Sequence, residues 1–99
     1  MAKGYVIFTE DVTDRDKMDA YAAKAVPTFL ASGGKALIAG PAEEVPEGEW
    51  HGNQTVVLEF ESLDAAKAWY HSDGYQAIIG EREAAATSNA VIFAGFEPG

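Results

Sequence analysis

Residues 4–10 read GYVIFTE, a run of aromatic and β-branched side chains that is typical of a β-strand. Alternate side chains of a strand point to opposite sides of the sheet, so Tyr5 and Ile7 share one side and Val6 and Phe8 share the other. Both sides are therefore apolar, whereas a strand with one face in water alternates polar and apolar residues. We expect this strand to lie in a sheet that is covered on both faces.

The segment that follows predicts a helix. Thr13 offers a side chain that can cap the helix start, and the Asp residues of the first turns complement the helix dipole. Pro27 lacks a backbone donor and should kink or restart the helix near Val26. Ser32 and the two glycines after it end the helix. Apolar residues recur at the spacing of one helix face, at Met18, Tyr21, Ala22, Ala25, Val26, Phe29 and Leu30.

Three more strands and a second helical region complete the pattern. Strands are expected over residues 35–39, 54–60 and 89–96, and helices over residues 63–71 and 74–86. With right-handed crossovers, this order predicts an α+β fold of the ferredoxin-like βαββαβ type, in which both helical regions cover one face of a four-stranded antiparallel sheet. The length of 99 residues fits a single domain over residues 1–99.

The second face of this sheet lacks a cover. The later strands repeat the pattern of the first, because Val57 and Ile92 are flanked by apolar residues that point to the opposite side. The chain has no further element for that face, and exposed apolar patches of this size usually mark an interface. We therefore expect a homodimer in which the open sheet faces of two copies pack together.

The charge balance limits the partners of the chain. Seven Lys and Arg residues stand against sixteen Asp and Glu residues, which gives a net charge of -9. Nucleic acids and anionic membrane surfaces bind proteins through basic residues, so we expect neither as a partner.

Several classes of site are also excluded. The chain has no cysteine, hence no disulfide and no thiolate metal site, and it carries no nucleotide-binding or zinc-binding motif. We expect no metal and no cofactor. No apolar run reaches the roughly 18 residues that span a bilayer, and no signal-like segment precedes the first strand, so a cytoplasmic location is expected.

Six short motifs carry a resemblance to a known family: KGYVI at residues 3–7, the pair Gly33-Gly34, GEW at residues 48–50, EFES at residues 59–62, AAKAWYHS at residues 65–72 and YQ at residues 75–76. In these motifs the chain resembles the bacterial domain-of-unknown-function family thirteen-thirty over nearly its whole length. That family is similar to a superfamily of ferredoxin-like subunits that includes cofactor-independent monooxygenases, muconolactone isomerases and stress-responsive proteins. The resemblance implies a dimeric α/β barrel but no reaction, because a fold does not fix a function.

The first candidate site lies in the last helical region. Tyr75, Ile78, Ile79 and Arg82 follow one another at helical spacing, which places Arg82 on the apolar face of its helix. The resemblance also implies an Arg at this place in the last helix. A charge there needs a partner, and Glu59, which interrupts an apolar strand, is the natural candidate. Arg82 could instead hold a carboxylate or enolate ligand through paired hydrogen bonds.

Two aromatic groups complete the candidate residues. Tyr70 and Tyr75 lie near Trp69 at the break between the two helical pieces, where they could line an aromatic pocket or belong to the core. Trp50 and His51 lie in the long connection over residues 40–53, and could form a pocket rim or a dimer contact.

These residues support two hypotheses. The first is a homodimer that binds a small anionic or aromatic metabolite, and the sequence leaves open whether it is a cofactor-independent enzyme. The second is a non-catalytic structural or stress-related dimer with no ligand, whose interior is filled by its own side chains.

Overall fold

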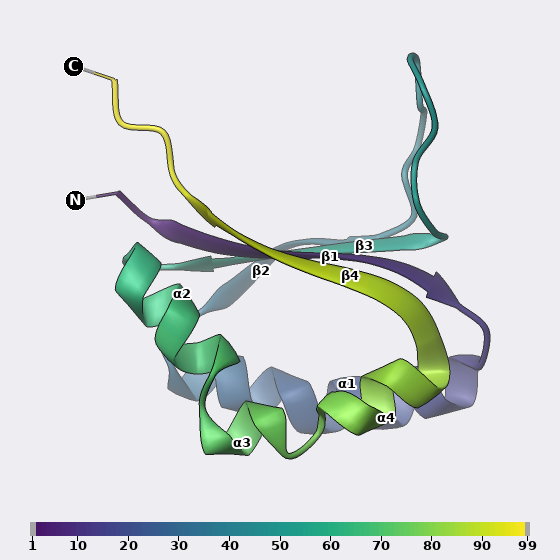
Figure 1. Cartoon of the computed structure of the whole chain (residues 1–99), viewed down its shortest axis with the longest axis horizontal. Helices are drawn as coiled ribbons and strands as arrows, with labels where there is room; N and C mark the ends of the chain where they lie inside the picture. Colours follow the sequence, from purple (N-terminus) through teal and green to yellow (C-terminus); the bar gives the residue numbers. More distant parts are fainter. Residues whose placement is uncertain (1, 99) are drawn as a thin grey trace.

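The computed structural model describes residues 2–98 of the chain. In chain order its elements are β1 (Gly4–Val12), α1 (Arg15–Ala31), β2 (Lys35–Gly40), β3 (Gln54–Phe60), α2 (Leu63–Tyr70), α3 (Asp73–Gln76), α4 (Ile79–Ala85) and β4 (Ala86–Ala94). The strands form one antiparallel sheet in the order β2-β3-β1-β4, and the helices lie together on one face of it (Figure 1). The predicted ferredoxin-like fold is thereby confirmed. None of the helices within this range is long and apolar enough to cross a membrane.

Helix α1 differs from the prediction in two details. Its N-cap is Asp14 rather than Thr13, because the carboxylate of Asp14 accepts a hydrogen bond from the backbone N–H of Lys17 at 3.0 Å. The helix does not restart at Pro27, since it continues through this residue to Ala31. Pro27 lies on the exposed side of α1, where water can bond to the carbonyl of Ala23 that loses its usual donor.

The second helical region consists of three short helices instead of two. The helix expected over residues 74–86 is interrupted, because α3 ends at Gln76 and α4 begins at Ile79. No side chain caps the start of α4, and Gly80 lowers helix propensity in its first turn. Strand β4 follows α4 directly at Ala86, three residues earlier than expected.

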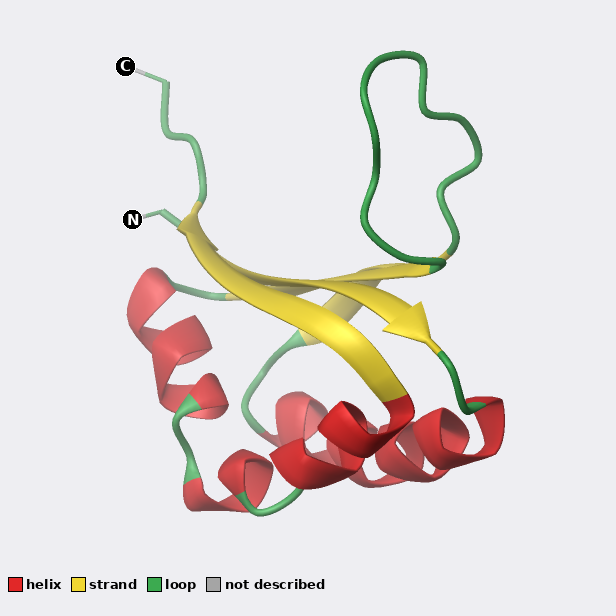
Figure 2. Ribbon diagram, turned by 45° about the vertical axis from the view of Figure 1, so that its right-hand side comes forward, coloured by secondary structure: helices red, strands yellow, loops and turns green. Residues whose placement is uncertain are grey.

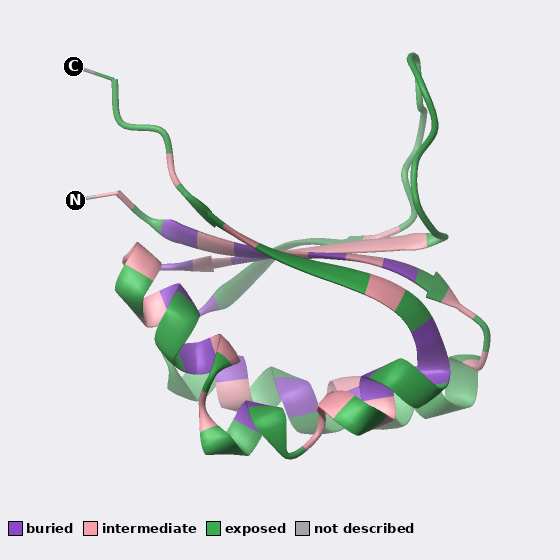
Figure 3. Ribbon diagram, in the orientation of Figure 1, coloured by how far each residue is buried: buried purple, intermediate pink, exposed green. Residues whose placement is uncertain are grey.

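The hydrophobic core lies between the sheet and the helices (Figure 3). Trp69 is central to it: its ring stacks on Phe60 with centroids 5.6 Å apart and lies 4.2 Å from the ring of Tyr75. The indole N–H of Trp69 donates to Oγ1 of Thr28 at 3.0 Å, so its polar atom is satisfied inside the core.

The other sheet face has no cover within residues 2–98. Tyr5 lies opposite Phe93 and Ile7 opposite Val91 in the register of β1 and β4, and these side chains point away from the helices. Phe93 is 52% exposed and Ile38 of β2 is 53% exposed. We call this surface the open face; its apolar members are Tyr5, Ile7, Ile38, Val57, Val91 and Phe93.

Two segments rise from the sheet on the side of the open face. Residues 41–53, which connect β2 to β3, stand at one end, and residues 95–98 leave the sheet at the other (Figure 2). Both expose apolar side chains, including Trp50 in the first segment and Phe96, at 89% exposure, in the second. We call them the two arms. The base of the first arm is fixed to β1, because the N–H of Asn53 donates to the carbonyl of Glu10 at 2.9 Å.

Candidate functional site

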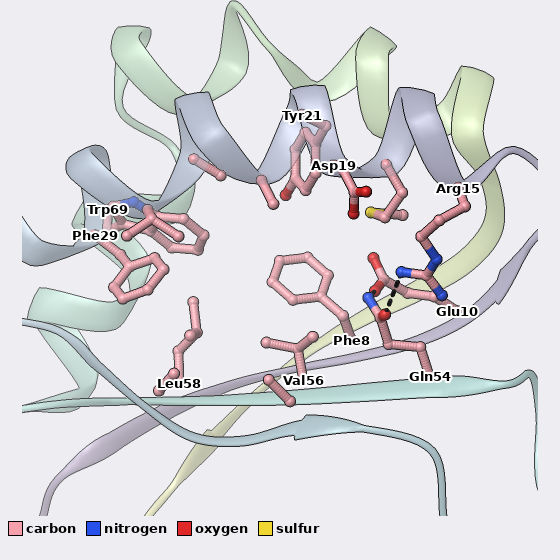
Figure 4. A pocket seen from close by; sticks show the side chains of 16 residues that line it. Phe8, Glu10, Arg15, Asp19, Tyr21, Phe29, Gln54, Val56, Leu58 and Trp69 are labelled. Carbon is pink, nitrogen blue, oxygen red and sulfur yellow. Dashed lines mark hydrogen bonds between the residues drawn. The ribbon is translucent and has the colours of Figure 1, made fainter.

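A cavity of about 250 Å³ lies between α1 and the helix-facing side of the sheet (Figure 4). Small side chains leave this space, because Ala22 and Ala25 of α1 and Ala36 and Ala39 of β2 line it. Strand β2 is at the sheet edge and both of its alanines are exposed, so the cavity opens to solvent there. We call it the α1 cavity.

Most of the cavity wall is apolar. Side chains of the sheet lie on one side, those of α1 lie on the other, and two aromatic rings close one end (Figure 4). The sheet contributes Phe8, Val56 and Leu58, and α1 contributes Met18 and Tyr21. The two rings at the end are those of Phe29 and Trp69. Such a wall suits a flat, weakly polar molecule.

The opposite end of the cavity is polar. Glu10 of β1 is only 2% exposed, and its Oε1 accepts a hydrogen bond from Nε2 of Gln54 at 2.8 Å. Nη1 of Arg15 donates to Oε1 of Gln54 at 3.0 Å, and Asp19 also lines this end. Burial raises the pKa of Glu10, while the hydrogen bond from Gln54 and the positive charge of Arg82 oppose that rise.

A buried polar network lies behind the cavity. The hydroxyl oxygens of Tyr21 and Tyr75 are 2.6 Å apart, and Nη1 of Arg82 donates to the Tyr75 oxygen at 2.6 Å. Nε of Arg82 donates to Oγ of Ser88 at 3.1 Å, and its guanidinium carbon lies 4.9 Å from the centre of the Phe8 ring. Burial raises the pKa of both tyrosines, so their hydroxyls are neutral near pH 7.

Arg82 is buried, at 6% exposure, but its predicted partner is wrong. Glu59 lies on the open face, where it accepts a hydrogen bond from the hydroxyl of Tyr5 at 2.9 Å and pairs with Nζ of Lys35 at 3.3 Å. The alternation of β3 explains this, because Leu58 and Phe60 point to the helices and Glu59 between them cannot. The sheet therefore separates Glu59 from Arg82.

The remaining candidates lie in two places. Tyr70 is half-buried beside Tyr75, with ring centroids 5.4 Å apart, in the helical layer. Trp50 and His51 lie on the open-face side: Nε1 of Trp50 donates to Oγ1 of Thr55 at 2.9 Å, and Nδ1 of His51 is 3.1 Å from Oγ1 of Thr9. The six predicted residues thus form no common site, and none of them lines the α1 cavity.

Among residues 2–98, no three His, Asp or Glu side chains are grouped so that they could hold a metal ion. The predicted absence of a metal and a cofactor stays a prediction.

The family model described as Domain of unknown function (DUF1330) matches residues 3–96. The chain belongs to this family. Among curated proteins, none matches its sequence.

Solved structures share the fold of this DUF1330 chain at low identity. A protein of unknown function from Rhodopseudomonas palustris is 18% identical with a TM-score of 0.77, covering 98% of this chain and 85% of that one. A dimeric ferredoxin-like protein of unknown function from Thermobifida fusca is 16% identical with a TM-score of 0.64, and the match covers 94% of this chain and 91% of that one. SnoaB, a cofactor-independent oxygenase from Streptomyces nogalater, is 13% identical with a TM-score of 0.63, and the match covers 98% of this chain and 94% of that one.

The polar residues of the cavity were missed in the sequence of this DUF1330 protein, although one signal was available. Glu10 lies two and four residues after Phe8 and Val6, so the alternation of β1 places its carboxyl on the helix-facing side. Gln54 lies opposite Glu10 in the register of β1 and β3, which only the paired sheet reveals. The sequence shows Tyr21 only as one of the apolar residues that recur at the spacing of one helix face.

Proposed function

We propose that this protein is a homodimer that binds a small aromatic molecule in the α1 cavity of each subunit. The observation that carries the proposal is the size of the cavity and the nature of its wall. A cavity of about 150 Å³ with apolar walls is sufficient to bind benzene, and the α1 cavity measures about 250 Å³. A substituted single ring fits this space.

The charges around the cavity favour a neutral ligand over an anionic one. Glu10 and Asp19 both contribute carboxyl groups to its lining, and the basic residue of the lining, Arg15, already donates to Gln54. Arg82, which the sequence suggested as an anion-binding group, donates to Tyr75 and Ser88 behind the cavity. The first hypothesis named an anionic or an aromatic ligand, and the aromatic ligand is therefore better supported.

The open face supports the homodimer. It presents apolar side chains from all four strands, β2, β3, β1 and β4, and their burial against a second copy is strongly favourable. The two arms stand at opposite ends of this face (Figure 2), where their exposed Trp50 and Phe96 would contact the second copy. The similar Thermobifida fusca structure is described as dimeric.

Ligand binding is tested by a thermal-shift screen with neutral single-ring aromatics. At a ligand concentration about tenfold above Kd, we expect Tm to rise by several degrees. Ala22→Phe, which fills the cavity from α1, should abolish the shift. Ala23→Phe is the matched control, because Ala23 is exposed and does not line the cavity. No shift with any ring, or an equal shift in both variants, would refute the proposal and favour the ligand-free dimer.

Cofactor-independent catalysis is a second candidate function. It is supported by the carboxyl group of Glu10 at the cavity end and by the likeness in fold to SnoaB, which is described as a cofactor-independent oxygenase. Oxygen uptake with a ring that binds in the screen is the direct test. Uptake that is abolished by Ala22→Phe supports an enzyme, and no uptake with a bound ring supports a binding protein.

A further inference from the structure

We propose that Glu10 selects the ligand of the α1 cavity by accepting a hydrogen bond from the hydroxyl group of a neutral phenol. This inference rests on the proposed function, in which the cavity binds a single aromatic ring, and adds the residue and the chemical group that decide which ring is bound.

The position of Glu10 is fixed by backbone contacts on both sides of β1. Glu10 lies opposite Gln54 of β3 and Ser88 of β4, and its carbonyl accepts from the N–H of Asn53 at 2.9 Å. Gly52, at φ 85°, lies so close to Glu10 that a Cβ at this position would overlap the Glu10 carbonyl. The side chain of Glu10 therefore extends from a rigid point of the sheet, as a binding group requires.

One oxygen of the carboxyl group is available to a ligand. Oε1 accepts from Gln54. No residue among 2–98 donates a hydrogen bond to Oε2. Every fully buried polar side-chain atom of that range has a partner, so an atom without one, such as Oε2, keeps some accessible surface. Because Glu10 lines the α1 cavity, a ligand in the cavity can reach this oxygen. In Figure 4 one carboxyl oxygen of Glu10 is directed at Gln54 and the other toward the side of α1.

The surroundings of Glu10 favour a neutral donor. A carboxylate ligand would be repelled by Glu10 and Asp19. An ammonium ligand would be repelled by Arg15, which lines the same end of the cavity, and by Arg82, whose positive charge interacts with Glu10. A phenol buries its ring against the apolar wall of the cavity and donates its single hydroxyl hydrogen to Glu10. A hydrogen bond to a charged acceptor is worth about tenfold to a hundredfold in affinity.

A structural explanation of Glu10 competes with this one. Glu10 lies close enough to Arg82 for their charges to interact, so its carboxyl could serve only to balance the buried guanidinium. That role requires no preference for a hydroxyl in the ligand, and the two explanations are separated by measuring such a preference.

The test compares two probes of similar shape, 4-ethylphenol and 4-ethylanisole, by isothermal titration calorimetry at pH 7. 4-Ethylanisole keeps the ring and its oxygen, which is now a methyl ether, and has no hydroxyl hydrogen to donate. The wild-type protein should bind 4-ethylphenol at least tenfold more tightly. Glu10→Gln should reduce this preference below about threefold and leave the affinity for 4-ethylanisole nearly unchanged. Asp11→Asn, an exposed neighbour on β1, is the control and should keep the wild-type preference.

Each of the other outcomes refutes either the role of Glu10 or the proposed function. Equal affinity of the wild-type protein for the two probes refutes the role of Glu10 while the proposed function stands. A preference for 4-ethylphenol that survives in Glu10→Gln but disappears in Tyr21→Phe assigns the acceptor to Tyr21. This result also refutes the role of Glu10. Binding of neither probe, together with no shift in the wider screen, refutes the proposed function itself.

If Glu10→Gln does not fold, the wild-type preference measured between pH 8 and pH 4 replaces it, because the lower limit lies below the raised pKa of Glu10. Protonation of Glu10 weakens it as an acceptor, so the preference for 4-ethylphenol should fall on acidification while the affinity for 4-ethylanisole stays constant. A preference that does not change over this range refutes the proposal. The charged and titratable groups of the packed helices near Glu10 are Arg15, Asp19 and Tyr21 of α1 and Arg82 of α4. Tyr75 of α3 bonds to both Tyr21 and Arg82.

Discussion

Arg82 donates a hydrogen bond to Tyr75, with Nη1 2.6 Å from the phenolic oxygen, inside the helical layer. Because Tyr75 bonds in turn to Tyr21 and Arg82 also bonds to Ser88, one buried network joins α1, α3, α4 and β4. Of these four residues, Tyr21 lines the α1 cavity. The network therefore connects Arg82, through Tyr75 and Tyr21, to the wall of the α1 cavity.

Replacement of Arg82 by Met should destabilise the fold by about 3 kcal/mol, because the hydroxyls of Tyr75 and Ser88 lose their donor and Glu10 loses a nearby positive charge. Urea unfolding followed by circular dichroism measures this change. Arg15→Met is the control: Arg15 is exposed, and its loss should cost less than about 1 kcal/mol. A small stability loss in Arg82→Met that accompanies a complete loss of ligand binding would instead make Arg82 a binding residue.

The contact between Tyr21 and Tyr75 can be measured by a double-mutant cycle. Each single change to Phe removes one hydroxyl of a buried pair whose oxygens are 2.6 Å apart, at a cost of about 1–2 kcal/mol in the free energy of unfolding. The double variant should lose less than the two costs added together, by about 1 kcal/mol, because both changes remove the same hydrogen bond. Additive costs would show that the two hydroxyls do not interact in solution.

The fold could be predicted because its signals are local. Apolar periodicity, glycine pairs and the order of the segments identify the strands, the helices and the layer of helices on one face. The errors have local causes as well: Asp14 and Thr13 are both capable N-caps, and a proline such as Pro27 is tolerated where its unpaired carbonyl partner faces water.

The site could be predicted only in part because it depends on pairing between distant segments. The spacing of Tyr75 and Arg82 was sufficient to place both on a buried face. The pairing of Arg82 with Glu59 failed, since it ignored that neighbouring residues of β3 point to opposite sheet faces. The α1 cavity results from four alanines on two elements, and no feature of the sequence shows that the side chains around them leave an open space.

The buried carboxyl of Glu10 predicts a stability that depends on pH. Burial raises the pKa of Glu10 above its ordinary value of 4.5, so the folded protein holds this proton more tightly than the unfolded chain does. The contribution of Glu10 to stability is therefore greatest below pH 4.5 and is lost as the pH rises through the raised pKa. Gln has no proton to lose. The free energy of unfolding of Glu10→Gln relative to wild type should thus increase between pH 4.5 and pH 7.5. Urea unfolding at several pH values checks this, and a constant difference would contradict it.

The open face predicts a dimer that one acidic side chain can disrupt. Phe93 is 52% exposed and lies opposite Tyr5 on the open face. Phe93→Glu places a charge in that contact, where burial without a partner costs several kcal/mol. Multi-angle light scattering at micromolar concentration should give the mass of a dimer for the wild-type protein and of a monomer for this variant. Leu30→Glu is the matched control, because Leu30 is similarly exposed, at 57%, but lies on α1, on the other side of the sheet. It should remain dimeric. A monomeric wild-type protein would contradict the sheet-to-sheet dimer, and loss of the dimer only in Leu30→Glu would move the interface to the helical layer.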